Sequence, residues 1–388
     1  MRSLPATVAC AVLALAGCGK PVSVYKTGEM SAASVSLPLG RRSIALVGDI
    51  MTWDDARANL EKHGARYPFL ATAPLLQGAD LAVGNLEGPV ATKATRRESR
   101  FPYKVPPWTL QGLKWAGFDA VSFANNHVAD CGVGGMLETF ESLRVAGIPW
   151  FGAGQDPPEA QAPRVFELGG RKVAFVGFVA ADTWFHEFED SLEPGAYRRM
   201  ERGMTRRFGV GKGRPGAVIA TAQSVAQGVR AAEEAADVVI AVFHFGIRYH
   251  RAPEEFQRGL AHAAVDAGAD LVVGHHAHFW QPAEVYKGKP IVYGVGNFAF
   301  GSGNREADEG LLVRAVLEDG RMEAVELFPL YIKNADDLVD FQPKVMKGAS
   351  ADEMLGRVSE ASRPLGARIA IEKGRGVLRL GQAAGGAP

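Results

Sequence analysis

The chain has 388 residues, and its 43 lysine and arginine residues balance 43 aspartate and glutamate residues, which gives a formal net charge of +0. This balance, without a basic patch or stripe, argues against a nucleic-acid partner. The length allows one large α/β domain or two domains of ordinary size, and 47% apolar residues are enough for a substantial core. Cys10 and Cys18 lie near the N-terminus, so Cys131 alone cannot form a disulfide framework in the body of the chain.

The first residues have the pattern of a bacterial export signal. Arg2 gives a positive start, and Val8–Leu15 is apolar but too short to span a bilayer. The run Leu15-Ala16-Gly17-Cys18 resembles the lipobox of bacterial lipoproteins. The resemblance implies a signal peptide over residues 1–18, cleavage before Cys18, and acyl chains on that sulfur that anchor the protein to a membrane. A plain signal peptide with an incidental cysteine is the alternative. We therefore expect an exported, membrane-anchored lipoprotein of the cell envelope, with residues 19–40 as a tether.

Seven short runs rich in Val, Ile, Leu and Ala show little alternation with polar residues, as is typical of strands buried on both faces. They are Ser43–Val47, Ala79–Val83, Asp119–Phe123, Lys172–Phe178, Asp237–Phe243, Asp270–Val273 and Ile291–Val295. Helical patterns separate several of them: one ends at Gly147, and two others cover Ala217–Ala236 and Glu254–Ala267. This alternation predicts a layered α/β fold.

Two further segments depart from this rhythm. Leu311–Leu317 and Met322–Phe328 flank Asp319-Gly320, which predicts a β-hairpin in the C-terminal part of the chain. Phe185–Pro215 is charged and lacks periodicity, so we expect either a functional loop over the site or a disordered segment. Its arginines are predicted to bind an anionic substrate, with a solvated loop face as the alternative; those named for the site are Arg198, Arg199, Arg206 and Arg207.

Residues of the kinds that bind metal ions follow the predicted strands directly. They are Asp49, Asn85-Leu86-Glu87, Asn125-Asn126-His127 with Asp130, His244, Gly274-His275-His276-Ala277-His278, and Asn297. Loops at the carboxyl ends of strands converge on one crevice in an α/β sheet, so we expect a single cluster. Histidine nitrogen mixed with carboxylate or amide oxygen suits Zn²⁺, Mn²⁺ or Fe better than Ca²⁺. The sequence therefore predicts a site for one or two divalent metal ions.

The same residues, in this order, resemble the motifs of the CapA, or poly-γ-glutamate capsule-synthesis, family. These motifs are Asp49, Asn-Leu-Glu at 85–87, Asn-Asn-His at 125–127, His-aromatic-Gly at 244–246, Gly-His-His-x-His at 274–278 and Gly-Asn-Phe at 296–298. That family is similar in turn to calcineurin-like metallophosphoesterases. The resemblance implies a sandwich of β-sheets flanked by helices over residues 43–333, with residues 334–388 as a C-terminal extension.

The resemblance also implies a role for each motif residue. The implied metal ligands are Asp49, Asn85 or Glu87 in a bridging place, Asn126 and His244 on a second ion, and His276 and His278, one for each ion. His127 would be the general acid that protonates the leaving group, with Asp130 orienting it. Two metal ions would clamp a phosphoryl or similar group and supply hydroxide.

Two departures keep a second function open. Phosphoesterases usually carry a histidine two places after the first aspartate, where this chain has Met51, and relatives often carry a glutamate where it has Arg248. The retained ligands and His127 favour a metal-dependent hydrolase that acts on a phosphoester or an anionic polymer in capsule or poly-γ-glutamate biosynthesis. The departures favour a non-catalytic, membrane-tethered accessory subunit that works with polymer synthase or export subunits.

Overall fold

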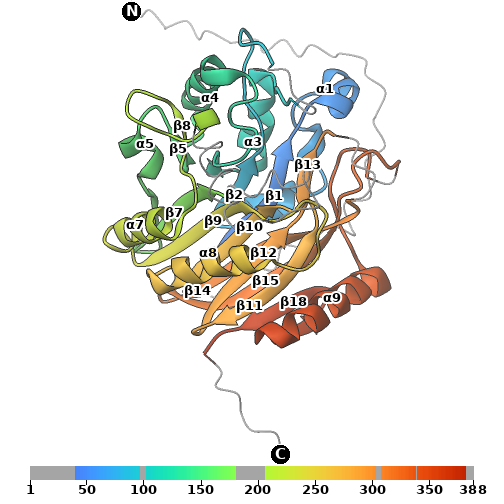
Figure 1. Cartoon of the computed structure of the whole chain (residues 1–388). Coiled ribbons are helices and arrows are strands. Elements are labelled where there is room, and N and C mark those ends of the chain that lie inside the picture. Colours follow the sequence, from blue (N-terminus) through green and yellow to red (C-terminus); the bar gives the residue numbers. More distant parts are fainter. Residues whose placement is uncertain (1–39, 97–101, 181–205, 303–306, 338, 382–388) are drawn as a thin grey trace, which may run out of the picture. The chain divides into compact units, whose positions relative to one another are not determined.

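The computed structural model describes residues 40–96, 102–180, 206–302, 307–337 and 339–381. Within these ranges the chain builds two large β-sheets that carry helices on their outer faces (Figure 1). None of the helices described there is both long and apolar enough to cross a membrane. The predicted signal peptide, Cys18 and nearly all of the tether lie outside the described residues, so the expectations about them stay predictions.

The first sheet has ten strands within the described residues, in the main order β17-β18-β15-β14-β1-β2-β3-β4, with β13 beside β1 and β16 beside β15. The strands β1 to β4 run parallel, whereas β14 and β15 run antiparallel to their neighbours. Their bounds are β1 Arg41–Met51, β2 Leu81–Leu86, β3 Ala120–Ser122, β4 Trp150–Phe151, β13 Asn297–Phe300, β14 Glu309–Glu318, β15 Arg321–Tyr331, β16 Lys344–Val345, β17 Ile369–Glu372 and β18 Arg375–Arg379.

The second sheet has the order β11-β12-β10-β9-β7-β6 in the described part of the chain. Its central strands β7, β9, β10 and β12 run parallel. The bounds are β6 Arg164–Leu168, β7 Arg171–Val179, β9 Val238–Phe245, β10 Leu271–His276, β11 Trp280–Tyr286 and β12 Lys289–Val295. A separate short pair joins β5 Ala153–Gly154 to β8 Gly216–Ala217.

The main core lies between the two sheets, and alternate residues of one strand serve different layers. In β9, Ile240 and Val242 belong to the core cluster shared with β1, whereas Ala241 and Phe243 pack with the helices over the outer face. Figure 1 shows α7 and α8 lying across this second sheet and α9 lying beside β18. The helices are α1 Arg57–His63, α2 Ala73–Gln77, α3 Leu110–Ala116, α4 Gly132–Ala146, α5 Pro157–Gln161, α7 Ala222–Glu233, α8 Glu255–Asp266 and α9 Gly348–Ser362.

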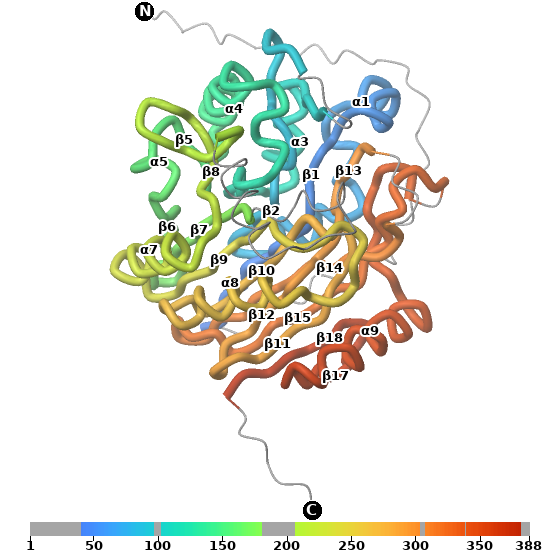
Figure 2. Tube along the Cα trace, viewed as in Figure 1, coloured from blue at the N-terminus to red at the C-terminus, as the bar shows by residue number. Residues whose placement is uncertain are grey.

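The predicted layered α/β fold and the predicted hairpin are confirmed. The hairpin is β14 and β15, and it lies inside the first sheet, because β14 pairs with β1 on one side and β15 pairs with β18 on the other. Figure 2 shows this return of the chain, with the late strand β14 close to the early strand β1. The C-terminal extension adds α9, β17 and β18, and Met354, Leu355 and Leu378 from these elements join the main core cluster.

The helix predicted over Ala217–Ala236 is shorter than expected. Ala217 belongs to β8, and α7 starts at Ala222, because Thr221 caps it. The Thr221 hydroxyl accepts a hydrogen bond from the Ser224 backbone at 3.0 Å, and the Ser224 hydroxyl accepts one from the Thr221 backbone at 2.9 Å. Such a reciprocal capping box satisfies two backbone N–H groups at the start of the helix, where no preceding turn can accept their hydrogen bonds. It therefore fixes the start of α7 at Ala222.

The strands that carry the site are longer than their apolar runs. β1 continues through Asp49, β2 through Asn85, and β10 through His276. The ladder pairs Asp49 with Asn85, and His275 with His244. An apolar run ends at its first polar residue, but the backbone hydrogen bonds of a strand do not depend on side-chain polarity. Asp49, Asn85 and His276 therefore lie within strands and not in loops.

Candidate metal centre

Asp49 is fully buried near the end of β1. Its Oδ1 accepts a hydrogen bond from Asn85 Nδ2 at 2.8 Å, and its Oδ2 accepts one from the His276 backbone at 3.3 Å. Burial opposes ionisation, but the His275 and His278 imidazoles and the Asn85 amide outweigh it and hold the pKa of Asp49 below its usual value. Asp49 therefore provides an ionised carboxylate at the centre of the cluster.

Glu87 directly follows β2, and its side chain is also fully buried. Neither carboxylate oxygen accepts a hydrogen bond from the described residues. Burial, and then the charge of Asp49, raise the pKa of Glu87 well above its usual value. Burying a carboxylate without hydrogen bonds is costly unless a cation lies beside it. The charge of Arg248 offsets only part of these effects, so Glu87 is the clearest indication that this place binds a further cation.

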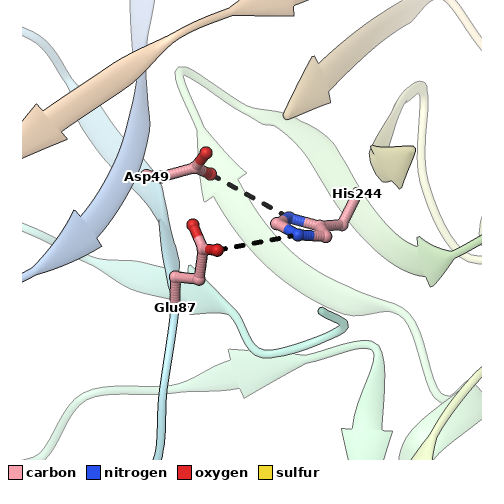
Figure 3. A group of neighbouring side chains, drawn as sticks. All are labelled: Asp49, Glu87 and His244. Carbon is pink, nitrogen blue, oxygen red and sulfur yellow. Dashed lines mark ion pairs between the residues drawn. The ribbon is translucent and has the colours of Figure 1, made fainter. Parts of the chain in front are cut away.

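His244, in β9, faces both carboxylates across the gap between the sheets, as Figure 3 shows. Its Nδ1 lies 4.0 Å from Asp49 Oδ1, and its Nε2 lies 3.9 Å from Glu87 Oε1. Two ligands that each lie about 2.0–2.2 Å from one ion are separated by at most about 4.4 Å, so the spacing between His244 Nε2 and Glu87 Oε1 is compatible with a shared ion. An imidazole offers one nitrogen to a given ion, so Nδ1 would not bind the same ion. Burial and then the neighbouring imidazoles lower the pKa of His244 well below its usual value, which leaves the neutral ring that metal ions require.

Asn126 and His276 complete the surroundings of His244. Asn126 Oδ1 lies 2.7 Å from His244 Nε2, and His276 Nδ1 lies 3.1 Å from the same nitrogen. His276 has a backbone φ of 85°, a conformation uncommon for a residue with a side chain. The strand therefore ends in a turn that changes the direction of successive side chains, which aims His276 at this group.

His278 lies on the Asp49 side of the cluster. Its Nδ1 is 3.6 Å from Asp49 Oδ2 and 2.7 Å from Asn297 Oδ1. Burial is the main cause that lowers the pKa of His278, against the opposing charge of Asp49. Together with the contacts above, the structure brings all the predicted ligands into one connected cluster: Asp49, Asn85, Glu87, Asn126, His244, His276 and His278.

The orientation of Asn85 distinguishes the two candidates for the bridging place. Its Nδ2 donates to Asp49 and lies 3.2 Å from His244 Nδ1. Its Oδ1 accepts a hydrogen bond from Asn125 Nδ2 at 3.2 Å. Because Asp49 can only accept, the amide nitrogen must face the centre and the oxygen must face away from it. Asn85 is therefore a hydrogen-bond donor to the site, which favours Glu87 for the bridging place.

Two buried residues of the site belong to the motifs predicted from sequence but were given no role there. His275 Nδ1 lies 3.4 Å from Asp49 Oδ1, and Asn297 pairs with Asp49 in the parallel ladder between β1 and β13. His275 occurs in the same histidine run as His276, and Asn297 follows closely after β12, so both were visible as motif members. Spacing alone did not indicate that the His275 ring points toward Asp49.

His127 and Asp130 form a pair at the edge of the cluster. His127 Nδ1 lies 2.6 Å from Asp130 Oδ2, and its Nε2 lies 3.5 Å from Glu87 Oε1. The His127 side chain is 15% exposed, whereas the Glu87 side chain beside it is fully buried. A ring that is held by a carboxylate and is partly exposed is suited to proton transfer to a bound molecule.

The predicted substrate arginines are only partly described. Arg206 is exposed and Arg207 is half-buried, just before the residues that pair with β8, whereas Arg198 and Arg199 lie outside the described residues. Their binding of an anion stays a prediction. Arg248 is half-buried, and its charge acts on Glu87 and on His278, so a cation lies near the site where relatives often carry a glutamate.

The donor set fits a divalent transition-metal ion. It offers neutral imidazoles, one ionised carboxylate, the carboxylate of Glu87 without hydrogen bonds, and the amide oxygen of Asn126. Asp49, Glu87 and His244 each offer one ligand atom, and these atoms all lie within 4.8 Å of one another, so the three residues could hold an ion of this kind after a small adjustment of their side chains. The fold and site therefore define a layered α/β protein with a candidate divalent-metal centre at the carboxyl ends of its parallel strands.

Comparison with known proteins assigns the family. The sequence profile of the bacterial capsule synthesis protein PGA_cap matches residues 43–302, a range that contains every residue of the cluster, and this chain belongs to that family. It is 28% identical to the capsule biosynthesis protein CapA of Bacillus anthracis over 75% of this chain and 67% of that one. It is 29% identical to the PGA biosynthesis protein CapA of Bacillus subtilis over 76% and 72% of the two chains. A probable polyglutamine synthesis accessory protein of Mycobacterium tuberculosis is 31% identical over 60% and 59%.

Glu87→Gln is expected to stabilise the metal-free protein at pH 8 and to weaken its metal binding. A carboxyl whose pKa is raised by folding favours the folded state when protonated, so this contribution is lost as the pH rises from the usual value of 4.5 through the raised pKa. Glutamine does not ionise, so the variant does not lose stability as the pH rises. Each kcal/mol of stability that it keeps raises the melting temperature by roughly 2–4 °C. With a divalent ion bound, wild type should instead melt at a higher temperature than Glu87→Gln, because the carboxylate binds the ion more tightly than an amide. Melting curves at pH 5 and pH 8, with and without chelator, measure both effects, and a metal-free wild type that melts above Glu87→Gln at pH 8 contradicts the assignment.

Proposed function

We propose that this chain is a metal-dependent hydrolase of capsule or poly-γ-glutamate biosynthesis that acts on a phosphoester or on an anionic polymer. The observation that carries the proposal is the position of the His127–Asp130 pair, 3.5 Å from the buried Glu87 carboxylate, which accepts no hydrogen bond from the described residues. The buried Glu87 carboxylate would be stabilised by a bound cation, and the His127–Asp130 pair can supply a proton. A metal site with only a structural role would have no use for an adjacent, partly exposed acid.

The residues of this chain divide the work as follows. Asp49, Glu87 and His244 would hold a divalent ion, which supplies Lewis acidity to the reacting group. The Asp130 carboxylate orients the ring of His127, whose Nε2 would give a proton to the leaving group. In this proposal an anionic substrate is held by Arg206 and Arg207, together with the preceding Arg198 and Arg199, which lie outside the described residues.

A non-catalytic role is the second candidate, and two observations favour it. Met51 is fully buried at the end of β1, at the position where phosphoesterases usually carry a histidine ligand. In addition, one relative is described as a probable accessory protein of polyglutamine synthesis. In this alternative the chain would be a membrane-tethered subunit that contacts a polymer synthase or export machine and uses the metal site for structure.

Metal analysis followed by a turnover assay distinguishes the two candidates. The full-length protein is purified, its bound metal is measured by elemental analysis, and hydrolysis of a phosphomonoester, a phosphodiester and poly-γ-glutamate is followed with Mn²⁺, Zn²⁺ or Fe²⁺. The hydrolase proposal expects turnover that a chelator removes and added metal restores. Stoichiometric metal without turnover on any of these substrates would favour the accessory role.

We also propose that Cys18 carries the lipid anchor, on the basis of the lipobox-like run Leu15–Cys18. Cys18→Ser is expected to move the protein from the membrane fraction to the soluble fraction, because several acyl chains contribute about 0.8 kcal/mol for each buried CH₂ and the serine variant has none. Fractionation followed by immunoblotting measures the change, with Cys10→Ser as the matched control. A serine variant at position 18 that stays in the membrane fraction rules out the lipoprotein interpretation.

A further inference from the structure

Tyr103 is a buried residue that the proposed chemistry does not yet use. It is 8% exposed and lies in a stretch that packs beside the residues after Glu87. Val105, two residues on, forms a parallel bridge with Val90. A Cβ atom at Gly88 would lie 2.9 Å from Tyr103 Cβ, so glycine at this position allows the tyrosine to come this close. The stretch that carries Tyr103 is therefore fixed to the same segment that carries Glu87.

The backbone of Tyr103 is tied to the carboxylate that holds His127. Its N–H donates to Asp130 Oδ2 at 2.8 Å, and the same oxygen lies 2.6 Å from His127 Nδ1. The Cys131 thiol donates weakly to the Tyr103 carbonyl at 3.7 Å. One carboxylate oxygen thus connects the Tyr103 backbone with the His127 imidazole, which fixes the distance between the two residues.

The ring of Tyr103 covers a face of the His127 imidazole. The two ring centroids lie 4.1 Å apart, with planes inclined by 32°. Tyr103 also packs edge-to-face with Phe300, with a centroid distance of 5.7 Å and an angle of 88°. The hydrogen bond to Asp130 lies at one edge of the imidazole and leaves the ring able to swing about that contact. A face contact with a ring that is itself packed against Phe300 restricts that swing.

We propose that Tyr103 is the positioning residue of His127, and that its aromatic face holds the imidazole so that Nε2 points toward Glu87 and the metal-binding cluster. We assign the placement to the aromatic face, whereas the tyrosine hydroxyl hydrogen-bonds Ser302. The consequence for turnover rests on the hydrolase function proposed above, whereas the placement itself does not.

Two substitutions separate the ring from the hydroxyl. Tyr103→Phe keeps the aromatic face, and Tyr103→Leu removes it while leaving an apolar side chain. The first readout is the NMR shift of the His127 Cε1 proton in full-length, metal-free protein labelled on histidine, assigned by its disappearance in His127→Gln. A stacked aromatic ring displaces this resonance through its ring current, so wild type and Tyr103→Phe should share a shift that Tyr103→Leu lacks.

The second readout is steady-state kinetics of the metal-loaded protein. Tyr103→Leu is expected to lower kcat by about 10- to 100-fold with KM and metal content nearly unchanged, because small misplacements of a catalytic group have effects of this size. Tyr103→Phe should stay within about threefold of wild type. A Leu variant that keeps the wild-type resonance or the wild-type kcat overturns the proposal, and so does a Phe variant that loses as much kcat as Leu.

A matched control and a second variant keep the test decisive. Tyr67 is also 8% exposed and stacks on a histidine, with its ring 4.9 Å from that of His63. Tyr67→Leu should reproduce any general loss of stability without moving the His127 resonance. If Tyr103→Leu does not fold, Tyr103→Met takes its place, since the flexible thioether fills apolar space without an aromatic ring. If wild type has no turnover, the hydrolase function fails, and the resonance alone decides whether Tyr103 positions His127.

Discussion

His127→Ala is expected to lower turnover by about 10²–10⁴-fold while the metal content stays at the wild-type level. The ring contacts Asp130 at 2.6 Å and lies 3.5 Å from Glu87, at the edge of the cluster and partly exposed. Its removal takes away the proton donor but none of the three residues whose ligand atoms lie together, Asp49, Glu87 and His244. The loss should therefore appear in kcat and not in metal stoichiometry, which elemental analysis of the same sample measures.

Two controls define what this result means. Asp130→Asn keeps the shape of the partner but removes its charge, so it should lower kcat less than removal of His127 does. His63→Ala removes an exposed histidine outside the cluster and should leave kcat unchanged. Wild-type activity in His127→Ala, in protein that binds metal and is active before the change, would exclude His127 as the acid.

His244→Ala should abolish most metal binding, the largest effect expected at any single position of the cluster. His244 lies within 4.0 Å of both carboxylates and contacts Asn126 and His276 as well. The substitution also leaves a cavity, which costs stability with or without metal. The informative quantity is therefore the rise in melting temperature on adding metal. A ligand at about 100 times its Kd stabilises a protein by roughly 2.7 kcal/mol, and this stabilisation should vanish in the variant.

His250→Ala is the matched control for this measurement. His250 is exposed, lies six residues further along the chain and pairs with Glu254 at 3.2 Å. Its removal should leave both the bound metal and the metal-induced rise in melting temperature as in wild type. A His244→Ala protein that retains a full equivalent of metal, or still gains the wild-type rise, would show that the ion binds elsewhere.

The strands β1, β2, β3, β7, β9, β10 and β12 could be predicted because their apolar runs are nearly unbroken. Short, nearly unbroken apolar runs such as Asp237–Phe243 are typical of strands that are buried on both faces. The parallel arrangement then brings the carboxyl ends of these strands together. This is why Asp49, Glu87 and His244 could be grouped from sequence although they are far apart along the chain. The boundaries were less accurate, because side-chain polarity marks the end of an apolar run and not the end of a hydrogen-bonded ladder.

Contacts between distant segments were beyond sequence reasoning. Tyr103 faces His127 only because the stretch around Val105 returns to pair with Val90, and no local pattern specifies that pairing. Likewise, β18 pairs with β15 in the first sheet, and the pattern of apolar and polar residues in a five-residue strand cannot determine such a long-range pairing. His275 and His276 are the same residue type in adjacent positions, so only the turn at His276 shows which ring points to which partner.

The course of β1 has a consequence for how the protein would work at a membrane. The strand begins at Arg41 and reaches Asp49 eight residues later, a rise of roughly 26 Å at about 3.3 Å per residue. The predicted tether joins the strand at its start, so the attachment point and the metal-binding residues lie at opposite ends of β1. If Cys18 is acylated, the length of β1 adds to the greatest distance from the lipid that the metal-binding residues can reach. The length of the predicted tether over residues 19–40 would then add to the same reach. Shortening the tether would restrict access to a growing polymer that stands out from the cell and would leave hydrolysis of a small soluble ester unaffected.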